Sequence, residues 1–526
     1  MSRPKLPIGI QSFQEIRTKG YVYVDKTPFI ASLVESGKYY FLSRPRRFGK
    51  SLLIDTIDCA FSGKKELFNG LFLSTTDAGW DFSISYPVLR IDLSGGTVRS
   101  ADDLTSRLDR LITYWEEVYN IPPTHGSPGE RLLYVIPQIA DQTRRQIVIL
   151  VDEYDKPILE TLNKQRVAVT FRNQLKDFYS AFKPLDPYLK FVFLAGVSKF
   201  AKTGIFSGLN NLKDITLDRR YSAICGYTER DLDTSFALWI KEHNKQTIQD
   251  WYNGYSWTGQ SVYNPFDILL YFDEGVLRPY WFETGTPTFL IQIWKSNPRM
   301  PADYDQMHAG DEILGSFDPE NIRLETLLFQ SGYLTIKRWY EDPIRGVRYV
   351  LGYPNVEVRT SLNILFSEVL VGRDTASKRE RLYDVISTGD LPQLRVLLEA
   401  LFSSIPHDWY RKNPIARFEG FYASVMYSFL ASTGFEVSAE DCTSAGRIDL
   451  TVKTSSAIWI FEFKVRRCDT RDMHPLHQIK EKGYAEKYAG AGVPIYLIGI
   501  VFDPDMKNIA EWEVEIREYT TTPSQG

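Results

Sequence analysis

The sequence predicts an α/β protein of several domains, with a mainly parallel sheet in its first half and a smaller α/β domain at its C-terminal end. Its 526 residues suffice for about three domains at roughly 100 to 200 residues each. Residues 38–215 alternate short apolar runs with stretches of helical periodicity, which is the pattern of β-α-β units. After residue 416 the pattern predicts a helix over 416–432, then strands, a helix over 472–489 and a last apolar strand.

The strands of the first sheet are predicted from short runs that are rich in β-branched, leucine or aromatic residues, as in buried strands. These runs are Tyr39 to Ser43, Val88 to Leu93, Ile147 to Val151 and Phe191 to Val197. After Gly49 apolar residues recur at helical spacing, which predicts a helix with one buried face.

The middle of the chain changes character. From about Gly226 to Met307 it is mainly helical in pattern and rich in Trp and Tyr, so we expect a helical lid. Residues 326–352 contain strand-like segments around the turn "EDPIRG", and a helical connector follows over about 358–411. The polar stretch 407–414 predicts a boundary near Asn413. The predicted domains are therefore 1–225 (sheet core), 226–310 (lid), 311–415 (small β element and connector) and 416–526 (C-terminal domain).

Composition excludes several classes of protein. A hydrophobic content of 43% with 24% charged residues is that of a folded chain. The formal net charge of −4 gives no chain-wide positive field, so any surface for nucleic acid must be local. Cys59, Cys225, Cys442 and Cys468 form no C-x-x-C pair, which excludes a disulfide scaffold. The N-terminus lacks a signal-peptide core and no apolar run is long enough to span a membrane, so we expect a cytoplasmic protein with no membrane partner.

The stretch "SRPRRFGKS", residues 43–51, ends as a phosphate-binding loop of the form G-x-x-x-x-G-K-[ST]. The first glycine of that pattern is replaced by Arg44, and Pro45 has no N–H to donate. The donors nearest the β-phosphate are all present, and the loop stands between a predicted strand and a predicted helix. We therefore expect it to bind ATP, with Lys50 on the phosphates and Ser51 on Mg²⁺. From these letters alone a coincidental turn is the alternative. The residues expected to bind nucleotide here are Arg47, Phe48, Gly49, Lys50 and Ser51.

An acidic motif later in the chain supports the interpretation of this stretch as a phosphate loop. In "VILVDEYD", residues 148–155, a buried strand delivers two carboxylates to the carboxyl edge of the sheet. We expect Asp152 to hold Mg²⁺ and Glu153 to orient and deprotonate the attacking water. A capped strand end is the alternative interpretation. Ser198, after the strand "FVFLAGV", is predicted to sense the γ-phosphate.

The stretch "GRIDLTVKTSSAIWIFEFKV", residues 446–465, carries a further set of charged side chains. Because alternate residues of a strand share a face, Glu462 and Lys464 point the same way, and a paired strand brings Asp449 beside Glu462. Two neighbouring carboxylates bind a hard cation such as Mg²⁺, and a lysine beside it stabilises negative charge. An ordinary solvated hairpin is the alternative. The pair His474 and His477 has no visible third ligand and is interpreted as structural or surface residues.

Together several segments resemble the bacterial AAA-ATPase-like family that carries a C-terminal PD-(D/E)XK nuclease domain. They are "YVDKTPFI", "FLSRPRRFGKS", "ILVDEYDKPI", "GVSKFAKTGIFSGLNNLKDIT" and "YWFETGTPTFL". The resemblance runs through nearly the whole chain, and it implies that Arg44 belongs to the family's own form of the loop. It also implies a P-loop NTPase fold for the sheet domain, with ATP and Mg²⁺ as cofactors. It identifies no arginine finger, for which Arg219 and Arg220 are candidates, with surface charge as the alternative.

The spacing of Asp449, Glu462 and Lys464 resembles the core of PD-(D/E)XK nucleases, which have a restriction-endonuclease-like α/β fold. By that resemblance Asp449 and Glu462 are metal ligands and Lys464 is the catalytic lysine. Glu419 is then the acid of the first helix and Gln478 a supporting residue. Ile448 stands where the superfamily is named for proline.

These features favour an ATPase whose nucleotide state regulates a fused Mg²⁺-dependent nuclease acting on DNA, with a role in defence against mobile DNA or in its maintenance. The local basic cluster of Lys464, Arg466, Arg467 and Arg471 could neutralise phosphates, with a solvated loop as the alternative. The chain could form a homo-oligomer. The alternative function is a nucleotide-switched module that binds nucleic acid or protein without cutting it.

Overall fold

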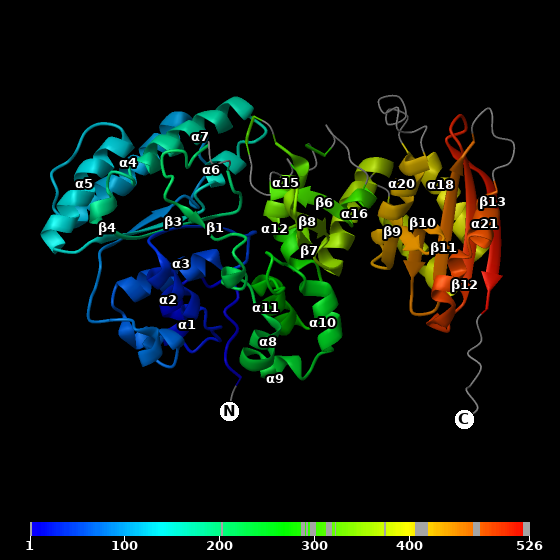
Figure 1. Cartoon of the computed structure of the whole chain (residues 1–526), viewed down its shortest axis with the longest axis horizontal. Coiled ribbons are helices and arrows are strands. Elements are labelled where there is room, and N and C mark those ends of the chain that lie inside the picture. Colours follow the sequence, from blue (N-terminus) through cyan, green and yellow to red (C-terminus); the bar gives the residue numbers. More distant parts are fainter. Residues whose placement is uncertain are drawn as a thin grey trace. The chain divides into compact units, whose positions relative to one another are not determined.

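The computed structural model divides the chain into two compact units (Figure 1). The first comprises Met1–Asn297 and His308–Asn355, and the second comprises Pro298–Met307 and Val356–Gly526. The residues that the structure describes are 3–200, 204–285, 290, 293–294, 301–311, 318–320, 322–372, 375–405, 419–466 and 474–518. In these ranges no helix is both long enough and apolar enough to cross a membrane.

The first unit is built on a five-stranded sheet with the order β2-β3-β4-β1-β5, in which every pair of neighbours is parallel. The predicted α/β class and parallel sheet are confirmed. The apolar runs became strands because both faces of the sheet are covered, and every residue of β1 and β3 is buried. The strands are β1 (Tyr39–Ser43), β2 (Val88–Asp92), β3 (Ile147–Asp152), β4 (Leu189–Gly196) and β5 (Lys213–Asp214).

Helices cover the two faces of this sheet. Figure 1 shows α4, α5 and α7 on one side and α1, α2 and α3 on the other. Two of them begin with capping boxes, Ser100 with Asp103 for α4 and Ser127 with Glu130 for α5, which satisfy N–H groups at the first turn. The helices are α1 (Phe13–Thr18), α2 (Thr27–Ser36), α3 (Lys50–Phe61), α4 (Ala101–Val118), α5 (Pro128–Thr143), α6 (Lys156–Leu159) and α7 (Gln165–Ser180).

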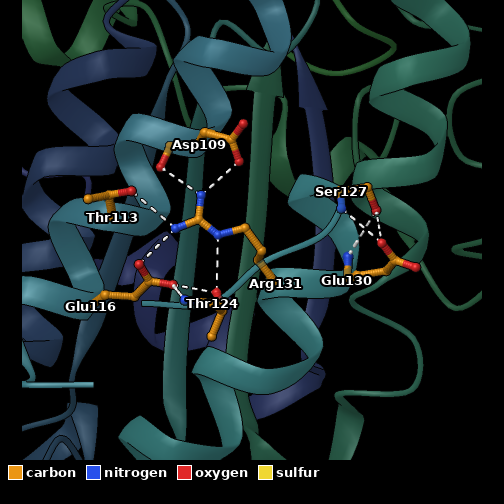
Figure 2. Close-up of polar contacts among 7 residues, drawn as sticks. All are labelled: Asp109, Thr113, Glu116, Thr124, Ser127, Glu130 and Arg131. Carbon is orange, nitrogen blue, oxygen red and sulfur yellow. Dashed lines mark hydrogen bonds and ion pairs between the residues drawn. The ribbon is translucent and has the colours of Figure 1, made fainter. Parts of the chain in front are cut away.

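A buried guanidinium joins α4 to α5 (Figure 2). Arg131 of α5 donates to Asp109 Oδ1 and Glu116 Oε2 of α4, both at 2.7 Å. It also donates to the hydroxyls of Thr113 and Thr124, both at 3.1 Å. The Arg131 side chain is 8% exposed and that of Glu116 is 3% exposed. Because both partners are out of water and fully bonded, they fix α4 against α5.

The helical segment predicted after residue 226 is present and packs its aromatic side chains into a core of its own with Val22 and Val24. It also contacts the loop between β1 and α3: Phe48 packs edge-on against Tyr255 and Trp257, with ring centroids 4.8 and 5.5 Å apart. The helices are α8 (Glu229–Ser235), α9 (Ala237–Ile240), α10 (Lys245–Tyr252), α11 (Pro265–Glu274) and α12 (Tyr280–Gly285).

A three-stranded sheet with the order β6-β8-β7 follows. The predicted hairpin around "EDPIRG" is confirmed by the antiparallel pair β7 (Thr335–Asp342) and β8 (Gly346–Gly352), and β6 spans Met307–Gly310. The strand-like interpretation of the start of 326–352 was wrong, because Leu324–Ser331 forms helix α15. Its apolar run is buried all round, and it ends at Gly332, whose φ of 94° closes a helix readily.

The second unit contains a mixed sheet with the order β13-β12-β11-β10-β9. Strands β9 to β11 are antiparallel, and β11 pairs in parallel with β12. The main helices are α16 (Val356–Val371), α17 (Ala376–Thr388), α18 (Leu391–Ser403), α20 (Glu419–Ala431) and α21 (Pro475–Glu481). The strands are β9 (Glu436–Thr443), β10 (Gly446–Lys453), β11 (Ile458–Val465), β12 (Ile495–Asp503) and β13 (Asn508–Arg517).

The helix predicted over 472–489 is broken. It begins at Pro475 in the described residues, ends at Glu481, and is followed by a 3₁₀ helix over Tyr484–Ala491. Gly483, with φ of 59°, makes the turn between them. The predicted boundary near Asn413 lies outside the described residues.

Candidate nucleotide and metal sites

The loop from Arg44 to Gly49 joins β1 to the start of α3. Arg47 and Gly49 have φ of 69° and 89°, so the backbone turns through left-handed conformations just before the helix. Such turns direct successive N–H groups toward a common point and form concavities for anions. Gly49 has no heavy atom within 4 Å of the position of an added Cβ, so the space beside it is open. The loop therefore has the backbone geometry of a phosphate site.

The side chain of Lys50 folds back over this loop. Its Nζ donates to the carbonyl oxygens of Arg44 and Pro45, both at 2.9 Å. Burial lowers the pKa of Lys50, while the carboxylates of Asp152 and Asp155 oppose that effect. These carbonyl groups are its hydrogen-bond partners among the described residues, and a buried ammonium group can donate to phosphate oxygens in their place.

Asp152 ends β3 next to the first turn of α3. Its side chain is buried, and burial raises its pKa, while a hydrogen bond from Ser51 and the charge of Lys50 oppose the rise. The backbone N–H of Glu153 donates to Asp152 Oδ1 at 2.9 Å. A hydroxyl and a carboxylate in contact are oxygen ligands of the kind that Mg²⁺ prefers, so Ser51 and Asp152 fit this ion.

A pocket of about 440 Å³ opens beside the loop, within the range of small-molecule sites. Its polar wall includes Arg46, Arg47, Lys50, Ser51 and Glu153. Its apolar wall comes from residues distant in sequence, Ile10, Tyr227, Pro265, Phe266 and Leu269. The guanidinium of Arg47 lies 4.5 Å from the centre of the Phe266 ring and so links the two walls. The pocket can take a ligand with a charged end and a flat apolar end.

Two further residues were expected at this site: Glu153 lies in the pocket wall, whereas Ser198 is buried. Glu153 lies in the pocket wall with its side chain 34% exposed, and its Oε2 is 3.7 Å from Lys156 Nζ. Ser198 is 2% exposed, and its hydroxyl donates to Asp155 Oδ2 at 2.5 Å. Asp155 also accepts from the backbone N–H of Val197 and Ser198. The hydroxyl of Ser198 thus points to Asp155, a buried carboxylate that sequence reasoning missed.

Asp449, Glu462 and Lys464 meet in the second unit, where β10 and β11 stop pairing. The antiparallel ladder reaches Leu450 and Phe461, and Asp449 Oδ2 then accepts from the Phe463 N–H at 2.7 Å. Lys464 Nζ lies 3.4 Å from Glu462 Oε1. The strand alternation that predicted this cluster therefore corresponds to its geometry.

The two carboxyl groups of this cluster are shifted toward their protonated forms. Burial, aided by nearby carboxylates, raises the pKa of Asp449 to about 6 and that of Glu462 to about 8. Burial alone would lower the pKa of Lys464, but Glu419, Glu462 and Asp449 outweigh it, and the pKa is raised. Glu462 Oε2 is buried and has no hydrogen-bond partner among the residues that the structure describes. An orphaned carboxylate oxygen beside a second carboxylate fits a divalent cation.

Comparison with known proteins identifies the families that two segments of the chain match. Residues 7–206 match a family model described as "Predicted AAA-ATPase", and residues 417–512 match the PD-(D/E)XK nuclease superfamily. A protein of Azotobacter chroococcum mcd 1, described as an uncharacterized protein in the vnfD 5' region, is 47% identical over 518 residues. The match covers 98% of this chain and 99% of that relative. The chain belongs to the AAA-ATPase-like family with a C-terminal PD-(D/E)XK nuclease domain.

In this AAA-ATPase-like protein, the arginine that replaces the leading glycine of the loop has a structural position. Arg44 is fully buried and donates to the carbonyl oxygens of Ser43, Thr216 and Tyr221 at 2.8 to 3.1 Å. Its guanidinium lies 4.1 Å from the centre of the Trp257 ring, and burial lowers its pKa to about 10. It supports the loop from behind and does not line the pocket.

Neither candidate for an arginine finger lines the pocket of its own chain. Arg219 lies over the ring of Trp339, 5.4 Å from its centre, and Arg220 pairs with Asp218 at 2.5 Å. No finger residue follows from this geometry.

Around the nuclease-like cluster, Glu419 Oε1 lies 3.4 Å from Lys464 Nζ, and Gln478 of α21 donates to Glu462 Oε1. His477 is exposed and faces Glu481 at 3.8 Å. Within the described ranges no group of three or more His, Cys, Asp and Glu side chains is arranged to hold a metal by itself. Of the expected basic cluster, Arg466 pairs with Glu511 at 2.6 Å, and Arg467 and Arg471 lie outside the described residues.

Proposed function

We propose that the chain is a cytoplasmic ATPase whose nucleotide state regulates a Mg²⁺-dependent nuclease domain acting on DNA. The observation that carries this proposal is that each of the two units brings together its own set of polar side chains. One has Lys50, Ser51 and Asp152 at a phosphate loop, and the other has Asp449 and Glu462 beside Lys464. A fold alone would support only the family, because unrelated functions share folds.

At the first site, the loop N–H groups and Lys50 would bind the phosphates of ATP, with the base against the apolar wall that includes Phe266 and Leu269. Glu153 in the pocket wall would accept a proton from the attacking water. Mg²⁺, when held by Ser51 and Asp152, supplies positive charge next to the phosphate oxygens. The product of this chemistry is ADP and phosphate.

At the second site, the raised pKa values of Asp449 and Glu462 mean that the pair retains a proton at neutral pH in the free protein. Mg²⁺, when held by these carboxylates, supplies the charge that favours their ionised forms and polarises a phosphodiester. Lys464 would orient water and stabilise negative charge on the phosphate, and Gln478 would fix the rotamer of Glu462.

Phosphate release from ATP tests the first half of the proposal. Lys50→Ala should abolish hydrolysis, because it removes the buried cation of the loop, whereas Lys65→Ala, at an exposed lysine, should leave the rate unchanged. Equal rates in the wild type and Lys50→Ala would contradict ATP hydrolysis at this loop.

Cleavage of labelled DNA tests the second half. With Mg²⁺ present, Glu462→Gln and Lys464→Ala should abolish cutting, and Glu513→Gln, at an exposed position of β13, should not. If the wild type binds DNA but never cuts it, the binding-module alternative replaces the nuclease. A role with mobile DNA, and a homo-oligomer in which Arg219 or Arg220 reaches a neighbouring pocket, stay predictions.

A further inference from the structure

A second pocket, of about 510 Å³, lies at the carboxyl end of β2, beside α4. Asp92 at the end of β2 is paired in register with Asp152 of β3, so this pocket opens at the same sheet edge as the nucleotide pocket. None of the residues that line the nucleotide pocket lines this one. It is therefore a separate cavity of the first unit, and it has no part in the proposed hydrolysis of ATP.

Two arginines of α4, Arg107 and Arg110, line this pocket. They are three residues apart and so project from one face of the helix. Among the described residues neither guanidinium has a hydrogen bond or an ion pair, in contrast to Arg131 of the neighbouring helix. Burial lowers the pKa of Arg107, the positive charge of Arg110 lowers it further, and the opposing charges of Asp92, Glu160 and Glu153 do not offset these effects. The pocket thus holds guanidinium donors without acceptors.

The pocket also contains two carboxylates, but backbone groups already occupy them. Asp92 Oδ1 accepts from the Ser94 N–H at 2.7 Å. Asp103 Oδ2 accepts from the N–H groups of Arg99 and Ser100 at 3.0 and 3.1 Å, in the capping box of α4. One oxygen of each carboxylate is therefore bonded to the backbone of its own loop, and among the described residues neither carboxylate forms an ion pair with Arg107 or Arg110.

The opposite wall of the pocket is bare backbone. A Cβ at Gly95 would lie 3.1 Å from Arg107 NH2, which is tighter than an ordinary contact, and Gly96 has φ of 68° with open space beside it. Glycine at position 95 leaves space beside the Arg107 guanidinium, and glycine at position 96 suits the left-handed backbone there. The rest of the lining, which includes Thr97, Ser106 and Leu111, contains no aromatic ring on which a base could stack.

The helix that presents the arginines is held on two sides. Arg131 binds its Asp109 and Glu116, as Figure 2 shows. From α7, Gln174 Nε2 donates to Ala101 O and Thr105 Oγ1, both at 3.0 Å. The helix backbone that carries the two arginines is thus held in place, which lowers the entropy lost when their side chains bind an anion.

We propose that Arg107 and Arg110, with the bare backbone at Gly95 and Gly96, bind a phosphate group of a ligand that is recognised without its base. The guanidinium fork matches two phosphate oxygens, and this geometry favours phosphate over a simple halide ion. The site adjoins the nucleotide pocket, because Lys156, which lines that pocket, donates to Ser94 O at the start of the glycine loop. The proposal does not depend on ATP hydrolysis.

Residue-level chemical labelling of the full chain tests it. An arginine-specific phenylglyoxal reagent is applied with and without sodium pyrophosphate, and peptide mass spectrometry gives the labelling rate of each arginine. Pyrophosphate should slow the labelling of Arg107 and Arg110 roughly threefold or more. The rate at Arg230, an exposed arginine of α8, should not change. Unchanged rates at Arg107 and Arg110, or equal slowing at Arg230, would overturn the site.

Variants and other ligands extend this labelling experiment. Arg110→Gln should weaken the protection of Arg107 at least several-fold, whereas Arg230→Gln should preserve it; protection that survives Arg110→Gln would overturn the shared site. A short oligothymidylate that protects at lower phosphate concentration than pyrophosphate identifies a nucleic-acid backbone as the source, and protection by pyrophosphate alone identifies a free phosphate compound. Mg²⁺ with ADP should protect Arg46 and Arg47, and failure there would count against the nucleotide site only.

Discussion

In the second unit, burial and the neighbouring Asp449 disfavour the ionised form of Glu462. Its side chain is 1% exposed, Asp449 lies nearby, and one of its carboxylate oxygens has no hydrogen-bond partner within the described part of the chain. Its pKa rises from 4.5 to about 8, so the folded chain binds a proton here that the unfolded chain has already lost. The stability that this proton gives is present below pH 4.5 and is lost as the pH rises through about 8.

Replacement of this acid should therefore stabilise the free protein at high pH. Glu462→Gln keeps the contact with Gln478 without the ionisable group, so we expect the free energy of unfolding at pH 8 to rise by roughly 1–3 kcal/mol. Urea unfolding between pH 5 and pH 8 without metal measures it, and Glu513→Gln is the matched control. A variant with the same pH dependence as the wild type would show that Glu462 is already ionised.

Replacement of Arg44 should lower the free energy of unfolding, in contrast to Glu462→Gln. Arg44→Gly would restore the leading glycine of the usual loop, but it would leave the carbonyl groups of Ser43, Thr216 and Tyr221 without their donor and Trp257 without its cation. We expect a loss of roughly 2–4 kcal/mol in the free energy of unfolding. Denaturant unfolding gives the value, with Arg46→Ala at the exposed neighbour as control. An unchanged midpoint would contradict a supporting role for Arg44.

At the scale of elements, α4 and α5 depend on one another through Arg131. Removal of Glu116 would leave the buried guanidinium of Arg131 with Asp109 as its carboxylate partner and would take away the acceptor of the Thr124 N–H, which costs more than an exposed pair is worth. Burial would raise the pKa of Glu116, but bonds from Thr124 and Arg131 outweigh it and keep this pKa below its usual value. The pair therefore stabilises the first unit at neutral pH, and that stabilisation falls as Glu116 is protonated in acid.

Glu116→Ala should accordingly destabilise the first unit by roughly 1.5–3 kcal/mol, because Arg131 keeps Asp109 as a partner. Glu117→Ala, at the exposed position next to it, should change stability by less than about 0.5 kcal/mol. Thermal unfolding followed by circular dichroism compares the two variants. Similar melting temperatures for both would mean that Arg131 finds another partner or water.

The sequence predicted the elements whose signal is local. Tyr39–Ser43 was predicted to the residue because a strand buried on both faces is a plain apolar run. Asp449 and Glu462 were brought together correctly because strand alternation fixes their faces. The helix at Leu324–Ser331 was missed, since a short apolar run buried all round fits helix and strand equally.

Tertiary contacts between distant segments were beyond the sequence signal. The apolar wall of the nucleotide pocket joins Ile10 to Phe266 and Leu269, and no periodicity relates residues so far apart. The buried site of Arg44 depends in the same way on Trp257 and Tyr221. The link of Ser198 to Asp155 had one weak signal, a further acid after the Asp152 and Glu153 pair.

At the scale of the whole molecule, the two polar sites lie in different compact units of one chain. The central claim is that the state of one site controls the chemistry of the other, which requires the nuclease domain to be more active in one nucleotide state. A coupling of 1–3 kcal/mol, typical of allosteric proteins, corresponds to a change in binding of roughly 5- to 150-fold.

The most direct test is the rate of DNA cleavage by the full chain in Mg²⁺ as ATP is titrated. The account predicts that ATP changes the rate roughly fivefold or more, that Lys50→Ala cuts at one rate at every ATP concentration, and that Glu462→Gln hydrolyses ATP without cutting. A wild-type cleavage rate that is the same with and without ATP, and the same as that of Lys50→Ala, would contradict it.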